Sequence, residues 1–107
     1  MAEADTATRA LILKLASDPA SVRVDKHARG EMLSWKLRVG EVCEAICGCL
    51  AADERLKATI IKTHPKEMVG QPAYELRPMI ANQRFYVRMA IYQSDKETLL
   101  IISVHPD

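Results

Sequence analysis

The stretch RFYVRMAIY, residues 84–92, decides the fold because its apolar side chains recur at every second position. Successive side chains of a β-strand point to opposite faces, so this period predicts a strand whose buried face carries Phe85, Val87, Met89 and Ile91. Residues 98–105, TLLIISVH, follow after a polar link, and residues 99–104 are apolar on both faces. We therefore expect a second strand there that is covered on both sides.

A third strand candidate, residues 74–81, precedes this pair, and the short link Asn82-Gln83 predicts a two-residue hairpin. In that register Arg77 lies opposite Arg88, on the same face as Arg84 and Tyr86. Like charges across a ladder are unfavourable, so Arg77 and Arg88 should splay apart or share an anion such as phosphate. Pro78 interrupts the strand and indicates a bulge or an edge position.

The second hairpin, with its turn in residues 93–97, leaves two registers open. In one of them His105 pairs with Tyr86 and joins the arginine-bearing face, whereas a slip of one residue turns the imidazole to the apolar face. We prefer the first register because it removes a titratable ring from the apolar side. The two hairpins then bring a phenol, an imidazole and several guanidinium groups onto one surface of the sheet.

The first half of the chain has helical periodicity instead. Apolar positions three and four residues apart predict a helix over residues 6–17, capped by Asp5 or Thr6, and a firmer one over 39–52. Shorter elements complete the pattern: a strand at 22–24, a helix at 27–33 capped by Asp25, a β-rich segment at 57–63 and a loop at 64–72. The sequence therefore predicts a single α+β domain, residues 1–107, with two or three N-terminal helices packed on an antiparallel meander of three to four strands.

Charge and hydropathy narrow the class of protein. Fifteen Lys plus Arg against fourteen Asp plus Glu give a net charge of +1, but residues 55–107 carry eight basic and five acidic side chains. An anionic ligand would therefore favour the second half of the chain. The longest apolar runs are four or five residues, and the start of the chain is not basic, so we expect no membrane span, no secretory signal and a cytoplasmic protein.

The three cysteines, Cys43, Cys47 and Cys49, lie within one predicted helix. Their odd number and close spacing favour reduced thiols that pack the helix over a disulfide framework. A zinc site is a weak alternative, because Cys49 lies on a different side of the helix from Cys43 and Cys47 and there is no Cys-x-x-Cys pair. We expect no metal, and the four isolated glycines provide no phosphate-binding loop.

The second half also resembles a known family. Three segments, GQPAYELRP at 70–78, RFYVRM at 84–89 and LIISVH at 100–105, resemble the C-terminal half of the motility quorum-sensing regulator (MqsR) toxins, which belong to the RelE-like bacterial endoribonucleases. The resemblance covers about 35 of the 107 residues. Residues 25–32 also resemble the opening of an uncharacterised family of small proteins that is distantly similar to these toxins.

The resemblance implies a RelE-like fold and roles for particular residues. By position, the family's RNA-cleavage residues correspond to Gln71, Tyr86, Lys62 or Lys57, and His105, where the family usually has a lysine. In this hypothesis Tyr86 and His105 exchange protons and Arg88 stabilises the transition state with Arg77 and Arg84, while Gln71 and Lys62 help to bind substrate. His64 is an alternative proton donor, whereas His27 is expected to cap or pack its helix.

The sequence thus favours a metal-independent endoribonuclease toxin without cofactors, which cuts single-stranded mRNA and is held inactive by a cognate antitoxin. A non-catalytic module that uses the same basic face to bind RNA or an acidic partner is the alternative. A third reading, an adaptor that grips a protein through the first helix and Trp35, rests on less.

Overall fold

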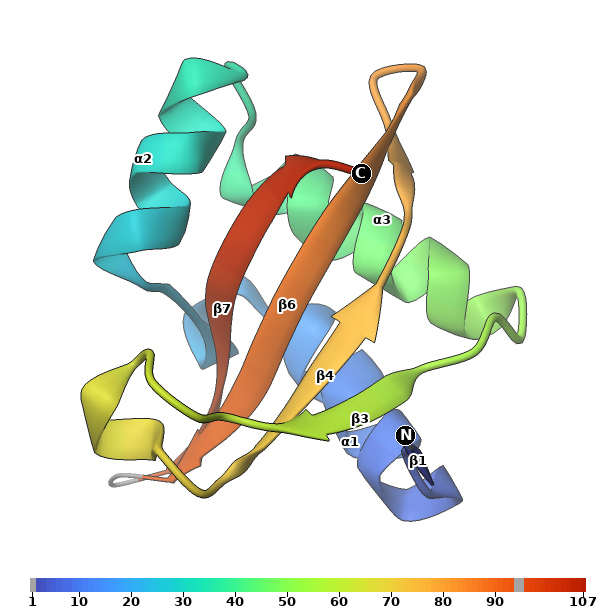
Figure 1. Cartoon of the computed structure of the whole chain (residues 1–107). Coiled ribbons are helices and arrows are strands. Elements are labelled where there is room, and N and C mark those ends of the chain that lie inside the picture. The colour runs from blue at the N-terminus through green and yellow to red at the C-terminus, as the bar shows by residue number, and fades with distance from the viewer. Residues whose placement is uncertain (1, 94–95) are drawn as a thin grey trace.

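The computed structural model describes residues 2–93 and 96–107 and has the expected α+β class, with three α-helices and a mixed sheet. Helices α1 and α3 pack behind the sheet, and α2 lies beside strand β7 (Figure 1). We call the sheet surface that faces α1 and α3 the back face, and the opposite surface the front face.

The helices lie close to their predicted positions: α1 is Thr6–Ala16, α2 is Lys26–Ser34 and α3 is Val39–Ala51. Asp5 and Asp25 cap α1 and α2 as predicted. The Asp5 carboxylate accepts a hydrogen bond of 2.7 Å from the Thr8 amide, and the Asp25 carboxylate accepts one of 3.1 Å from the His27 amide. None of the described helices is long and apolar enough to cross a membrane.

The strands form one sheet in the order β1-β3-β4-β6-β7-β2, and β5 pairs with β6 beyond the end of β4. Their bounds are β1 Ala2–Glu3, β2 Val22–Val24, β3 Lys57–Ile60, β4 Pro72–Leu76, β5 Met79–Ile80, β6 Gln83–Gln93 and β7 Glu97–Pro106. The predicted antiparallel meander is confirmed for β3, β4, β6 and β7. The expectation of three to four strands, all antiparallel, is wrong for the whole sheet, because β2 pairs in parallel with β7 and the short strands β1 and β5 also join.

The first predicted hairpin register is wrong by two residues. Ala81 and Asn82 have positive φ angles of 52° and 65° and make the turn, so Ile80 pairs with Gln83. A two-residue turn with two positive φ angles suits the twist of a hairpin. A shift of two residues preserves the faces, but Glu75, rather than Arg77, lies opposite Arg88.

The second hairpin has the preferred register, with Tyr86 opposite His105 on the front face. The chain turns between Gln93 and Glu97, which pair with each other; residues 94 and 95 of this turn lie outside the described part of the chain. Pro78 separates β4 from β5, as expected from its interruption of the strand, and its carbonyl accepts a 2.8 Å hydrogen bond from the Phe85 amide.

Two apolar clusters stabilise the sheet. The larger one fills the space between the back face and the helices and includes Ile12, Ile46 and Ile101, all fully buried. The smaller one covers the lower front face, where the segment after β3 folds over β6 and β7 and packs Ile61 and Met68 against it. Strand β7 is therefore buried on both sides as predicted, whereas no described helix lies in front of the upper ends of β6 and β7 (Figure 1).

Candidate functional site

Tyr86 and His105 form the centre of the uncovered part of the front face. They are cross-strand neighbours, and their half-buried rings lie 5.0 Å apart between centroids at a tilt of 30°. Nδ1 of His105 lies 3.0 Å from the Pro106 carbonyl oxygen, which can only accept a hydrogen bond. This contact places the proton of the neutral ring on Nδ1, so Nε2 carries the lone pair that a general base requires.

Arg77 covers the Tyr86 ring from the side of β4. Its guanidinium carbon lies 5.2 Å from the ring centroid, a distance at which a cation is attracted to an aromatic face. Nε of Arg77 also donates a 3.3 Å hydrogen bond to the Asp107 carboxylate. Arg84 donates a 2.7 Å hydrogen bond to the Arg77 carbonyl oxygen and so holds the backbone of Arg77. Of the predicted arginines, Arg77 therefore packs against the phenol ring, and Arg84 supports it.

Arg88 belongs to a row of polar residues that crosses four strands: Lys57, Glu75, Arg88 and Ser103. Residues directly opposite each other in a sheet share a face and interact. Arg88 thus has a carboxylate on one side and a hydroxyl on the other, in place of the second arginine that the sequence predicted. Glu75 was missed because the predicted register put Arg77 in its place.

Glu75 also changes the chemistry of Tyr86. Burial of the phenol, followed by the proximity and the negative charge of the Glu75 carboxylate, raises the pKa of Tyr86 to about 12. Arg88 and Arg77 act in the opposite direction and lower this pKa, but they do not cancel the increase. Tyr86 therefore keeps its proton at neutral pH, and it can donate a proton but is a poor base.

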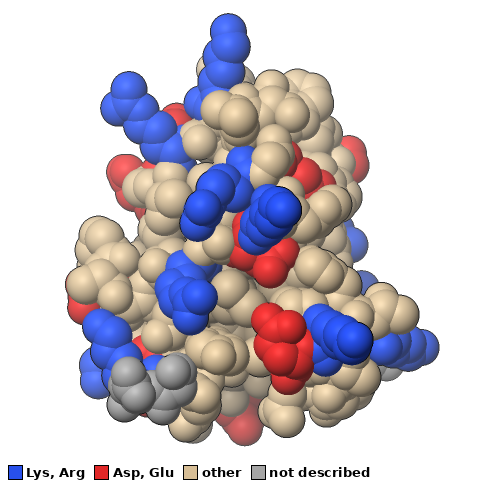
Figure 2. All heavy atoms as spheres, turned by 90° about the vertical axis from the view of Figure 1, so that its left-hand side faces the viewer, with Lys and Arg blue, Asp and Glu red and all other residues tan. Residues whose placement is uncertain are grey.

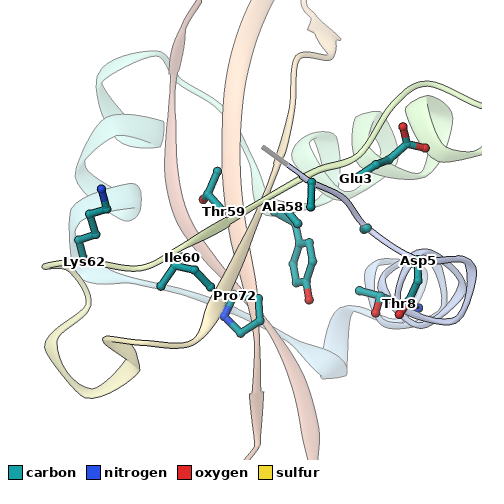
Figure 3. A pocket seen from close by; sticks show the side chains of 11 residues that line it. Glu3, Asp5, Thr8, Ala58, Thr59, Ile60, Lys62 and Pro72 are labelled. Carbon is teal, nitrogen blue, oxygen red and sulfur yellow. Dashed lines mark hydrogen bonds between the residues drawn. The ribbon is translucent and has the colours of Figure 1, made fainter.

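The predicted substrate residues Gln71 and Lys62 lie away from this group. Extending the β4–β6 register puts position 71 opposite position 92, six residues along β6 from Tyr86, or about 20 Å. Lys62 follows β3 and lines a pocket at the sheet edge, at the opposite end from Glu3 and Asp5 (Figure 3). Contact of Gln71, Lys62 and Tyr86 with one RNA would therefore require several extended nucleotides.

A second group of titratable side chains joins α2 to the loop after β3. Nε2 of His64 lies 2.9 Å from the Asp25 carboxylate, and the His64 ring packs edge to face against the His27 ring, with 5.9 Å between centroids. Nε2 of His27 lies 3.6 Å from Glu31, one helical turn further along α2. The contact between His27 and His64 was not predicted, because nothing in their spacing along the sequence indicates that the loop and the helix meet.

Glu31 connects this group to β7. One of its carboxylate oxygens accepts 2.9 Å hydrogen bonds from the Ser103 hydroxyl and from the Val104 amide. Ser103 is the cross-strand neighbour of Arg88, so the two polar groups lie on adjoining parts of the molecule. Within residues 2–93 and 96–107, no three His, Cys, Asp or Glu side chains are arranged to hold a metal ion.

The cysteines pack α3 as the sequence predicted. Cys43 and Cys49 are buried and Cys47 is partly exposed, and all three are free thiols. Burial raises the pKa of Cys43 to about 11 and, together with Glu54, that of Cys49 to about 12. These two thiols therefore remain protonated at neutral pH and are poor nucleophiles.

Comparison of the chain with family models, with curated proteins and with solved structures gave no match. The geometry of the front face and the resemblance of three short segments therefore remain as the features that point to a function.

Proposed function

We propose that the protein is a metal-independent endoribonuclease of the RelE-like toxin type, which cleaves single-stranded mRNA through attack by the RNA's own 2′-hydroxyl. The observation that carries this proposal is the Tyr86–His105 pair, in which a proton donor and a proton acceptor lie side by side and Arg77 covers the ring of the donor. Such a pair supplies both proton transfers that the reaction needs.

In the proposed reaction Nε2 of His105 removes the proton from the 2′-hydroxyl, and the 2′-oxygen attacks the adjacent phosphorus. The bond from phosphorus to the 5′-oxygen breaks, and Tyr86 gives its proton to that oxygen. The products are a 2′,3′-cyclic phosphate and a 5′-hydroxyl. The proton held by His105 then restores the phenol, either directly between the adjacent rings or through water.

The raised pKa of Tyr86 fits the role of acid. The phenol stays protonated until the 5′-oxygen leaves, and an alkoxide is more basic than a phenolate, so the transfer is favourable. Arg77 and Arg88 supply positive charge for the phosphate oxygens as negative charge accumulates on them. For Arg88, the phosphate must compete with Glu75, which lies opposite it.

The order of elements supports the RelE-like assignment, since the three α-helices precede the antiparallel run β3, β4, β6 and β7. The parallel strand β2 is an addition to the arrangement we expected. In this proposal the protein acts on mRNA in the cytoplasm and is neutralised by a cognate antitoxin, as the sequence resemblance implies.

A non-catalytic binding module is the second candidate, and one observation favours it. Two arginines of the front face already have acidic neighbours: Arg77 is held by Asp107, and Arg88 lies opposite Glu75. A surface arranged in this way could bind RNA or a protein without reacting. Such a module would lose RNA affinity steeply with added salt and leave the RNA intact.

The deciding experiment incubates the purified protein with end-labelled single-stranded RNA in the presence of EDTA. We expect cleavage that leaves a 2′,3′-cyclic phosphate, and no cleavage of an RNA whose 2′-hydroxyls are replaced by hydrogen. An RNA that is bound but uncut, at concentrations where a known toxin cuts it, would contradict the nuclease proposal and support the binding module. Cleavage that requires an added divalent metal would contradict the mechanism.

A further inference from the structure

The structure has a second surface that the proposed reaction does not use, a groove beside the edge strand β2. It is lined by residues from β2, α2 and the start of α3, and has a volume of about 590 Å³. Six of its lining residues are apolar and the other three are Arg23, Arg29 and Arg38. None of the described residues that line it is acidic, so in this part of the chain the groove has an apolar floor and a cationic rim.

Two apolar side chains of this groove are exposed to solvent. Leu33 on α2 has 79% of its surface exposed and Val39 at the start of α3 has 37%. Exposed apolar side chains gathered in a hollow with a polar rim are typical of a protein interaction site. Among residues 2–93 and 96–107, no ion pair includes Arg23, Arg29 or Arg38. Figure 2 shows this side of the molecule, where blue Lys and Arg side chains are spread among smaller groups of Asp and Glu.

The backbone of β2 gives this groove a template for an extended chain. Strand β2 is the last strand of the sheet and pairs only with β7. The Asp25 amide donates to the Ile101 carbonyl of β7, and neighbouring amides of a strand point to opposite sides, so the Val24 amide faces the open edge. Arg29 stands at that edge, with its guanidinium group 3.4 Å from the Val24 carbonyl oxygen.

We propose that this groove binds an extended segment of a partner protein in which apolar residues alternate with Asp or Glu. The segment pairs with the open edge of β2, its apolar side chains enter the groove over Leu33, and its carboxylates meet Arg29 and Arg38. Strand addition supplies affinity through main-chain hydrogen bonds, and the alternate side chains supply specificity. The proposal does not rest on ribonuclease activity, because neither Tyr86 and His105 nor the arginines around them line the groove.

The test begins with a library of short random peptides displayed on phage, selected on the immobilised full chain. We expect the enriched peptides to alternate apolar and acidic residues. Fluorescence anisotropy then measures the binding of one enriched peptide to the wild-type protein and to two variants, Leu33→Asp and Arg38→Glu. Both changes are at exposed positions, so the variants should fold, and each should weaken binding about tenfold or more.

Matched controls are available elsewhere on the surface. Ile60, which is 54% exposed on β3 near the other edge of the sheet, controls for Leu33 as Ile60→Asp, and Lys66→Glu controls for the charge reversal. Both controls should bind the peptide like the wild type. The proposal is overturned if no peptide is enriched, if the enriched peptides are basic, or if Leu33→Asp and Arg38→Glu bind them normally. It is also overturned if Arg38→Glu weakens RNA binding and the enriched peptides fail to compete with RNA, since the groove would then be a nucleic-acid surface.

Discussion

Glu75 on β4 lies directly opposite Arg88 on β6, and its carboxylate helps to raise the pKa of Tyr86, the residue two positions before Arg88. This carboxylate therefore acts on both a candidate acid and a candidate cation of the front face. It adds to the rise in the pKa of the phenol and places a negative charge opposite the guanidinium group.

Replacing Tyr86 with Phe should reduce RNA cleavage about 100-fold or more, because the reaction loses its proton donor while the ring and its packing remain. Cleavage of labelled RNA under single-turnover conditions measures the effect. Tyr92→Phe is the matched control, since Tyr92 lies on the same face of the same strand, beneath Arg23, and should keep full activity. Equal activity of Tyr86→Phe and the wild type would contradict the assigned role.

Replacing His105 with Ala should also reduce cleavage about 100-fold or more, because no base then removes the 2′-hydroxyl proton. His64→Ala is the matched control, since it removes the imidazole that contacts the Asp25 carboxylate and leaves the front face intact. A loss of activity in His64→Ala, with normal activity in His105→Ala, would place the proton transfer at the contact between His64 and Asp25 instead.

Replacing Glu75 with Gln should lower the pKa of Tyr86 towards its ordinary value, because the variant removes the negative charge that opposes phenolate formation. Absorbance titration of tyrosinate, compared with the same titration of Tyr86→Phe, isolates this one phenol. An unchanged titration would show that burial alone raises the pKa.

The raised pKa of Tyr86 should also make alkaline pH destabilising. The folded state binds this proton more tightly than the unfolded state, so its contribution to the free energy of unfolding is complete below about pH 10. It is lost as the pH rises towards about 12, the pKa in the folded protein. Urea unfolding at several pH values should show a stability difference between the wild type and Tyr86→Phe that changes over this range. The thiols of Cys43 and Cys49 are present in both proteins and cancel in the comparison.

Replacing Glu31 with Ala should lower the free energy of unfolding by about 1–3 kcal/mol, because the Ser103 hydroxyl and the Val104 amide lose their acceptor. Denaturant unfolding measures this loss. Glu44→Ala, at an exposed position on α3, is the matched control and should change stability by less than about 0.5 kcal/mol. Similar effects of the two substitutions would contradict the anchoring role of Glu31.

The long elements could be predicted from the sequence because their periodicity depends on local residues. Strand β6 was predicted from the alternation of its apolar and polar side chains, and β7 from apolar side chains on both of its faces. The pairing of Tyr86 with His105 was preferred because the other register places an imidazole on the apolar face. The pairing of β4 with β6 was predicted, but its register was wrong because the expected turn, Asn82-Gln83, starts one residue later than the observed turn, Ala81-Asn82. A turn displaced by one residue moves every cross-strand partner by two.

Contacts between distant short segments could not be predicted in this way. Strand β2 was recognised from Val22 and Val24, but three residues carry too little pattern to identify β7 as its parallel partner. The meeting of His27 with His64 depends in the same way on how a loop folds back over a helix. Half of the candidate site was thus predictable from strand alternation, and the part that joins α2 to the loop was not.

The parallel pairing of β2 with β7 also affects how the chain folds during synthesis. Residues 22–24 leave the ribosome early, yet the strand that completes their hydrogen bonds comprises residues 97–106. Until that segment emerges, β2 and β6 each lack a neighbour, and the helices have only part of their core to cover. The newly made polypeptide therefore cannot complete its native topology before residues 97–106 emerge, and without them it has an unfinished sheet with exposed apolar surface.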